Sequence, residues 1–197
     1  MPNGVPRLII VGGASGSGKS YIARSFGAPA VELDAFYREI DEDLDDRLPR
    51  TPYGEIDWDD VGTFRTQHAV DALLRLVEHR AVTVPVYDLS ISRRSGSRQL
   101  RVTHGPVIAE GVFASAVVEE LRRRSVAYDA WYVIESPTLT MLRRFARDVR
   151  EARKPLPFLV RRGLALRRAE SRLREEAQQA GFVLTKKSRI KRILRAL

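Results

Sequence analysis

The amino-acid sequence predicts an α/β fold, in which helices cover both faces of a central, mostly parallel β-sheet and so form three layers. Two observations support this prediction. Short apolar runs, typical of buried parallel strands, alternate along the chain with segments whose apolar residues recur at helical spacing. A glycine-rich segment at residues 13–18 follows the first apolar run and precedes the first helical segment, as a loop at the carboxyl edge of such a sheet does.

The expected elements follow from the apolar runs and from the turn residues between them. Strands are expected at Leu8–Val11, Ala30–Leu33, Val82–Tyr87, Arg98–Thr103, Val107–Ala109, Ala130–Ile134 and Phe182–Leu184. Helices are expected at Ser20–Phe26, Ala114–Arg123, Pro137 to about Arg150, about Phe158 to Gln179, and at the C-terminus. One more helix carries the apolar residues between Val70 and Val77, and Asp59 and Asp60 are its expected caps.

The chain of 197 residues suits a single domain over residues 1–197 that carries a lid. The lid is expected at about 143–157 and an insert rich in carboxylates at about 35–60. No cysteine is present, which excludes disulfides and thiolate metal sites. The longest apolar run near the N-terminus, Leu8–Val11, is too short for a signal peptide or a membrane span, so we expect a cytoplasmic protein.

The net charge of +9 is unevenly distributed along the chain. Residues 32–60 hold 12 of the 25 acidic residues, and residues 122–195 hold 21 of the 34 basic ones. A basic C-terminal half suits a protein that attracts a phosphate-rich small molecule, although solvated helix faces explain most of these charges equally well. We therefore expect no specific nucleic-acid partner and no membrane partner.

Residues 13–20 match the phosphate-loop (P-loop) motif G-x-x-x-x-G-K-[ST] in full. The matching residues are Gly13, Ala14, Ser15, Gly16, Ser17, Gly18, Lys19 and Ser20. Glycines let successive backbone N–H groups point at phosphate oxygens, and the following helix aims its positive end at the same place. Lys19 supplies a charge for the β- and γ-phosphates, and the Ser20 hydroxyl is a ligand for Mg²⁺. The motif predicts ATP and Mg²⁺ as cofactors and a fold of the P-loop NTPase type.

The remaining sequence narrows the class of P-loop protein. GTPases read guanine with an Asn-Lys-x-Asp element, and the only asparagine here is Asn3. Transport and helicase ATPases need further nucleotide motifs, so a small-molecule kinase is the class that remains. Such a kinase needs a carboxylate beside the γ-phosphate to orient and deprotonate the acceptor hydroxyl. Asp34, at the end of the second expected strand, is the candidate, although a turn or capping role would also explain it.

Four further segments resemble the uridine kinase (uridine–cytidine kinase) family. They are Leu33-Asp34-Ala35-Phe36-Tyr37-Arg38, Pro85-Val86-Tyr87-Asp88, Ile108-Ala109-Glu110-Gly111 and Arg143-Arg144-Phe145-Ala146-Arg147-Asp148. With the P-loop they follow one another in the family's order between residues 13 and 148. The resemblance implies ATP-dependent phosphorylation of the 5′-hydroxyl of a pyrimidine nucleoside.

The resemblance also implies roles for individual residues. Asp34 falls at the family's catalytic base, and Glu110 falls at a carboxylate that helps to hold Mg²⁺. Asp57 is similar to the aspartate that grips the ribose hydroxyls, and Tyr87 to a residue that lines the base pocket. Arg144 and Arg147 match lid arginines that neutralise the phosphates during transfer.

Three departures from the family leave the acceptor open. Ser92 stands where the family has its pyrimidine-reading histidine, and residues 151–154 differ from the family's lid continuation. From Pro155 onward the chain shows no clear match to the family. A kinase of another small alcohol, such as pantothenate or a sugar phosphate, is one alternative. A regulatory nucleotide-binding module without catalysis is another. By analogy with the family, a homo-oligomer is possible.

Overall fold

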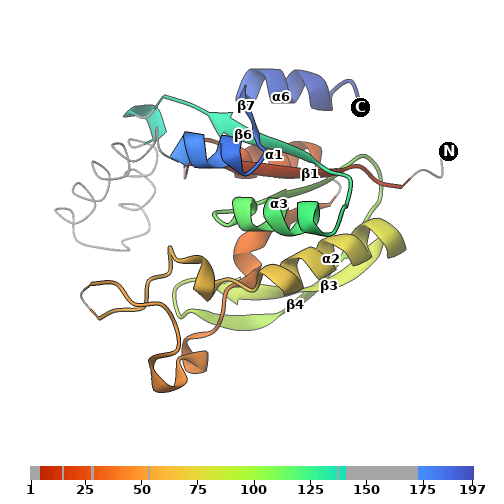
Figure 1. Ribbon diagram of the computed structural model, residues 1–197. Coiled ribbons are helices and arrows are strands. Elements are labelled where there is room, and N and C mark those ends of the chain that lie inside the picture. Colours follow the sequence, from red (N-terminus) through yellow and green to blue (C-terminus); the bar gives the residue numbers. More distant parts are fainter. Residues whose placement is uncertain (1–4, 15, 28, 53, 137, 141–172) are drawn as a thin grey trace.

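The computed structural model describes residues 5–14, 16–27, 29–52, 54–136, 138–140 and 173–197 (Figure 1). The expected lid at about 143–157, most of the helix expected from Pro137 to Arg150 and the start of the helix expected at Phe158 lie outside these residues. Residues 138–140 and 173–179 are helical, as predicted.

Five parallel strands form the central sheet in the order β2-β5-β1-β6-β7. Their bounds are Leu8–Gly13 (β1), Ala30–Glu32 (β2), Val107–Glu110 (β5), Asp129–Ile134 (β6) and Val183–Lys186 (β7). Since β1 and β5 run parallel with Val11 opposite Glu110, their carboxyl ends lie at one edge of the sheet. The predicted α/β fold is confirmed.

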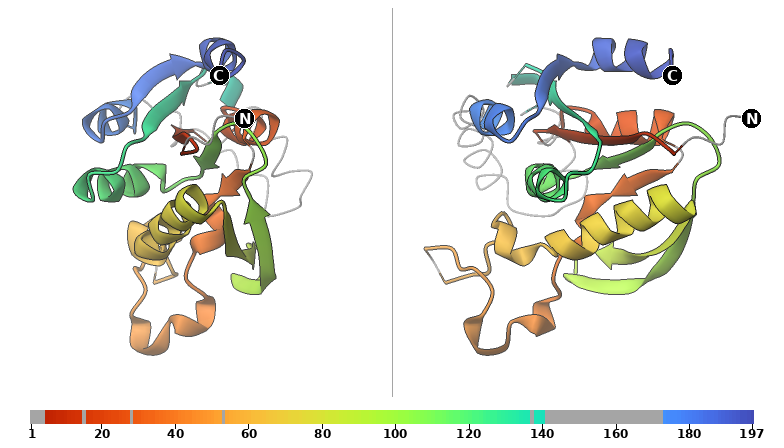
Figure 2. Two further views of the ribbon diagram at one scale, coloured as in Figure 1. Left: turned by 90° about the vertical axis from the view of Figure 1, so that its right-hand side faces the viewer. Right: turned by 45° about the vertical axis from the view of Figure 1, so that its right-hand side comes forward.

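Helices cover both faces of this sheet (Figures 1 and 2). Ile9 and Val11 of β1 pack with Ile22 of α1 (Lys19–Phe26) and Ile190 of α6 (Lys187–Leu194). Leu8 and Ile10 belong to the core cluster on the other face, beneath α2 (Thr66–His79) and α3 (Ala114–Arg123). Alternate residues of a strand face opposite sides, so an apolar run buried on both faces is the pattern that this arrangement requires.

A separate antiparallel hairpin lies beside the carboxyl end of β2. It consists of β3 (Ala81–Asp88) and β4 (Arg93–Arg101), with a register shift between Val86 and Tyr87. Val84 and Leu100 are its buried side chains and join the core beneath α2. The sequence predicted both strands, although β4 begins five residues earlier than expected.

The carboxylate-rich insert is held together by arginines and by aromatic packing. It contains short 3₁₀ turns at Ile40–Glu42 and Leu44–Asp46. Arg50 pairs with Asp43 and Asp46, and Arg65 pairs with Glu42. Many of the acidic charges are therefore neutralised locally, and the insert is not an open acidic surface.

Further expected boundaries were wrong, two of them for a local reason. Asp60 caps a 3₁₀ turn at Val61–Thr63 by accepting from the Gly62 amide at 2.7 Å, so α2 begins later, after Arg65. The expected strand Ala30–Leu33 ends at Glu32 because a 3₁₀ turn begins at Leu33. The last strand, expected at Phe182–Leu184, begins at Val183 and continues to Lys186.

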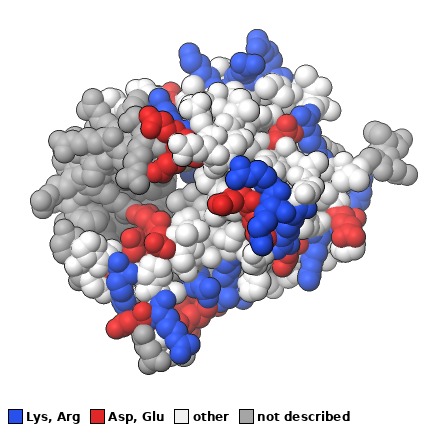
Figure 3. Space-filling view, viewed as in Figure 1, with Lys and Arg blue, Asp and Glu red and all other residues white. Residues whose placement is uncertain are grey.

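Basic and acidic side chains lie among one another on much of the face shown in Figure 3. Arg124, directly after α3, pairs with Glu120 of that helix and, at 2.6 Å, with Asp71 of α2. In the described part of the chain, no helix has the length and apolarity that crossing a bilayer requires.

Candidate active site

The P-loop connects β1 to α1 in a conformation that depends on its glycines. Gly18 precedes the first turn of α1 with φ of 92°, a left-handed conformation that favours glycine. At Gly13 a Cβ atom would lie 2.7 Å from the Ser17 hydroxyl, so a side chain there would collide with the loop. Ser15 is outside the described residues. The motif's glycines thus keep the loop tight enough to surround an anion.

The P-loop has an unsatisfied polar group. The Ser17 side chain is fully buried, and its hydroxyl has no hydrogen-bond partner among the described residues. Buried hydroxyls are normally bonded, and a phosphate oxygen in the loop would be a suitable acceptor. The loop therefore fits the triphosphate that its motif predicts.

Lys19 and Glu110 form a buried ion pair beside the P-loop. The Lys19 ammonium lies 4.0 Å from a Glu110 carboxylate oxygen, and both side chains are about nine-tenths buried. Burial raises the pKa of Glu110; Lys19 and a hydrogen bond from Ser20 oppose this shift, and the nearby Asp34 and Glu32 add to it. Burial disfavours the charged form of a carboxylate, and a nearby cation stabilises that form. One hydroxyl and one carboxylate, completed by waters and phosphate oxygens, fit Mg²⁺.

Asp34 lies close to Glu110 because the ends of β2 and β5 meet. It follows β2 in the 3₁₀ turn Leu33–Phe36, and one carboxylate oxygen accepts a hydrogen bond from the Val112 amide at 3.3 Å. Between them, Gly111 leaves no room for a side chain, since a Cβ there would lie 2.9 Å from the same oxygen and 2.7 Å from the Leu33 Cβ. The Glu-Gly pair at the end of β5 thus sets the position of Asp34.

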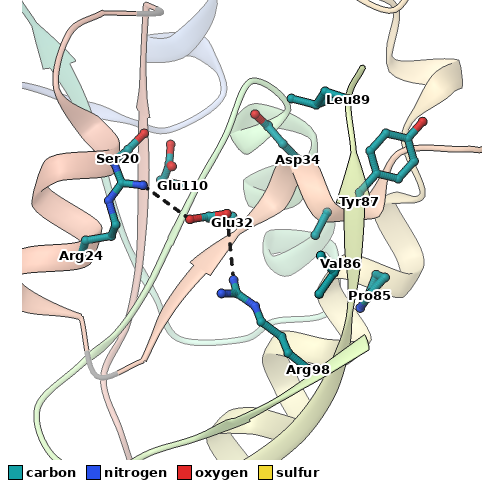
Figure 4. A pocket seen from close by; sticks show the side chains of 11 residues that line it. Ser20, Arg24, Glu32, Asp34, Pro85, Val86, Tyr87, Leu89, Arg98 and Glu110 are labelled. Carbon is teal, nitrogen blue, oxygen red and sulfur yellow. Dashed lines mark ion pairs between the residues drawn. The ribbon is translucent and has the colours of Figure 1, made fainter. Parts of the chain in front are cut away.

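A pocket of about 340 Å³ opens between α1, the end of β2 and the hairpin (Figure 4). Its lining combines the predicted site residues with a largely apolar wall from the hairpin and with charged residues from α1, β2 and β4. The lining residues are Ser20, Arg24, Glu32, Asp34, Ala35, Pro85, Val86, Tyr87, Leu89, Arg98 and Glu110. The predicted metal ligands, base and base-pocket tyrosine therefore share one cavity.

Tyr87 lines the pocket, but its hydroxyl is already bonded. The hydroxyl donates to the Arg38 carbonyl at 2.7 Å. Burial raises the pKa of Tyr87 to about 12, against a smaller opposing effect of a hydrogen bond with Ser92. The ring packs at 5.8 Å from Tyr37, within an aromatic group that joins the insert to the core.

The structure does not bring every predicted residue to this pocket. Within the described residues, Asp57 and Ser92 are absent from its lining. An Asp57 carboxylate oxygen accepts from the Asp59 amide at 3.1 Å, and Ser92 lies against Tyr87. Arg144 and Arg147 lie outside the described residues.

Sequence reasoning missed three charged residues that line the pocket. Glu32 lies between Arg24 at 3.7 Å and Arg98 at 4.0 Å (Figure 4). Their spacing from predicted site residues could have identified Arg24 and Glu32. Arg24 is four residues after Ser20, on the same face of α1, and Glu32 is two residues before Asp34. Arg98 has no such signal, because only the fold brings β4 to β2.

Gly111→Ala tests whether the end of β5 holds Asp34 in place. Because the new methyl group would press on Leu33 and Asp34, we expect a loss of about 1–3 kcal/mol in the free energy of unfolding, the usual cost of overpacking. The measurement is urea unfolding, with Val112→Ala as control since its side chain is exposed. A Gly111→Ala protein as stable as the control would contradict the close packing.

Tyr87→Phe tests the buried hydrogen bond of the tyrosine. When the ultraviolet titration curve of the variant is subtracted from that of wild type, the difference should show one phenol. Its pKa should lie near 12, above the ordinary value of 10. Since the folded-state pKa is raised, the stability that the hydroxyl contributes should be present below pH 10 and lost between about 10 and 12. A difference titration centred at 10 would show that the hydroxyl is solvated.

Several curated relatives that match most of the chain are named uridine kinases. A uridine kinase from Geobacillus kaustophilus is 28% identical over 169 residues, which cover 82% of this chain and 76% of the relative. A uridine kinase from Streptococcus agalactiae serotype V is 26% identical over 162 residues, covering 79% and 74%. No family model matches the chain.

A solved structure supports the fold independently. A protein from Silicibacter sp. TM1040, provisionally named a fructose transport system kinase, superposes with a TM-score of 0.64 at 18% identity, covering 94% of this chain and 92% of its own. At that identity the likeness concerns the fold alone. Together with the curated relatives, it confirms that this chain has the P-loop kinase fold and resembles the uridine kinases.

Proposed function

We propose that the protein transfers the γ-phosphate of ATP to the 5′-hydroxyl of a pyrimidine nucleoside, with uridine or cytidine as the leading acceptor. One observation carries the proposal. Ser20, Asp34, Glu110 and Tyr87, which the motifs predicted separately, line the same pocket, and Lys19 lies beside it in a pair with Glu110. The curated relatives named uridine kinases support the choice of acceptor.

The nucleotide end of the site is the P-loop. Gly13 to Ser20 would surround the phosphates, with the Ser17 hydroxyl among the donors and Lys19 as the mobile charge. Ser20 and Glu110 would hold Mg²⁺, which when bound neutralises charge on the transferring phosphoryl group. The pair between Lys19 and Glu110 already holds both side chains in place. Lys19 would then meet the phosphates and Glu110 would meet Mg²⁺.

Asp34 would orient the acceptor hydroxyl and accept its proton. It shares the pocket with Ser20 and Glu110, so a hydroxyl bound to it lies near the metal end of the site. The Val112 amide bonds to one of its carboxylate oxygens and fixes its direction. Such positioning supplies most of the catalysis in phosphoryl transfer.

The hairpin would supply the surface for the base. Ala35, Pro85, Val86 and Leu89 form apolar wall beside the Tyr87 ring, which suits a flat heterocycle. Ser92 would act on the base indirectly, through its hydrogen bond with Tyr87. The proposed roles of Asp57 at the ribose and of Arg144 and Arg147 at the phosphates rest on the resemblance.

A second acceptor class is favoured by the charged side of the pocket. Arg24 and Arg98 flank a single carboxylate, Glu32, so this side carries a surplus positive charge. An alcohol with a phosphate or carboxylate, such as a sugar phosphate or pantothenate, would find a partner there. Arg98 would then bind the anionic group of the acceptor.

An acceptor panel separates the two classes. ADP release, measured with uridine, cytidine, adenosine, guanosine, pantothenate and ribulose 5-phosphate, should give the highest kcat/KM with uridine or cytidine. Arg98→Ala should change kcat/KM for these nucleosides little. A strong preference for an anionic alcohol that Arg98→Ala removes would replace the nucleoside with the second class. ADP release with none of them would defeat the proposal.

Asp34→Asn tests the chemistry. The change keeps the size of the side chain but removes the proton acceptor, so kcat should fall at least about 10²-fold, the usual loss for a general base. The affinity for ATP should change little. Asp41→Asn, an exposed aspartate outside the pocket, is the matched control. Near-normal turnover in Asp34→Asn would transfer the role to another carboxylate, with Asp57 the first candidate.

A further inference from the structure

Lys187 reaches the P-loop from the opposite end of the chain. It is the first residue of α6, directly after β7. Its Cδ and Nζ atoms lie 3.2 and 3.3 Å from the position that a Cβ would take at Gly18. The ammonium group therefore lies beside the space that a side chain at Gly18, the glycine that precedes Lys19, would occupy.

The sheet topology explains this contact. β7 pairs in parallel with β6, and β6 pairs in parallel with β1, so the carboxyl ends of β1 and β7 lie at the same edge. α1 and α6 both begin at that edge and cover the same face of the sheet, where Ile22 and Ile190 share one core cluster (Figures 1 and 2). The first residue of α6 is consequently held beside the start of α1.

Within the described residues, Lys187 has no carboxylate at ion-pair distance. Its ammonium lies 5.7 Å from the centre of the Tyr21 ring, and Lys191 lies over the same ring at 4.3 Å. Residues 186–197 carry six basic residues and no acidic one, and the upper edge of Figure 3 is accordingly basic. A half-buried cation that has no counter-ion among the described residues, beside a loop built for phosphate, is complementary to an anion.

We propose that Lys187 is a second cation of the nucleotide site and that it binds the α- or β-phosphate. Lys19 points toward Glu110, the end of the site where transfer would occur. Lys187 lies at Gly18 and Tyr21, where the loop and the first turn of the helix cradle the α- and β-phosphates. The proposal rests on the nucleotide-binding part of the proposed function and is independent of the acceptor.

The two lysines then have different kinetic roles. The α- and β-phosphates stay with the nucleotide throughout the reaction, so a contact to them is equally strong before and during transfer. Such a contact lowers KM without raising kcat. Loss of Lys187 should therefore raise KM for ATP at a nearly constant kcat, whereas loss of Lys19 should abolish turnover.

The experiment measures ADP binding by calorimetry, in the absence of any acceptor. Lys187→Met keeps most of the unbranched side chain beside Gly18 and removes the charge, so Kd for ADP should rise about tenfold or more, as for a charged hydrogen bond. Lys187→Arg should retain most of the affinity. Lys191→Met is the matched control, because Lys191 also lies over the Tyr21 ring but contributes none of the three atoms nearest to Gly18. Melting temperatures of the ligand-free proteins and the Kd for adenosine should stay unchanged.

Three results would overturn the assignment. Lys187→Met could bind ADP as wild type does, it could lose adenosine equally, or Lys191→Met could lose ADP to the same extent. The third result would show that the combined positive charge of α6 attracts ADP, and not a contact made by Lys187 itself. If wild type binds ADP, Lys187→Met loses it and no tested alcohol is phosphorylated, then the Lys187 assignment stands while the proposed acceptor fails. A wild type that binds no ADP overturns both.

Discussion

The buried ion pair between Lys19 and Glu110 is the interaction on which the site depends. A carboxylate at the end of an apolar central strand is costly unless a partner compensates it, and Lys19 is the cation that does so. The pair links the first turn of α1 to β5, next to β1, and so fixes the P-loop relative to the sheet. It also places a cation and an anion where a triphosphate and its metal would bind. Lys19 would then pair with a phosphate and Glu110 with the metal, so neither side chain would lose its counter-charge.

The geometry around this pair determines how the rest of the site is assembled. Glu110 and Gly111 end β5, and the Val112 amide that follows them bonds to Asp34 at the end of β2. The hairpin lies opposite these strand ends and closes the pocket with Tyr87, whose hydroxyl is used to hold the insert through the Arg38 carbonyl. The proposed positions for phosphate, metal, proton acceptor and acceptor surface thus follow one another around one edge of the sheet, as ligands do in open α/β sheets.

Much of this could be predicted from the sequence because the relevant signals are local. The P-loop is a contiguous motif, the strands of the central sheet are short apolar runs, and Asp34 and Glu110 directly follow or end two of them. What the sequence could not show depends on how the chain folds. The Asp57 carboxylate accepts a hydrogen bond within its own turn, which its local sequence does not reveal, and nothing near Arg98 indicates that β4 brings it to Glu32. Likewise, Lys187 lies 169 residues from Gly18 in sequence and reaches it only through the strand order of the sheet.

The most direct test of the central claim is the effect of Mg²⁺ on ADP affinity in wild type and in Glu110→Gln. If Glu110 exchanges Lys19 for the metal, Mg²⁺ should tighten ADP binding in wild type and should tighten it much less in Glu110→Gln. In the absence of Mg²⁺, the variant should bind ADP at least as well as wild type, since Lys19 is then released for phosphate. An unchanged Mg²⁺ effect in Glu110→Gln would contradict the account, because the carboxylate would then serve only to neutralise the lysine.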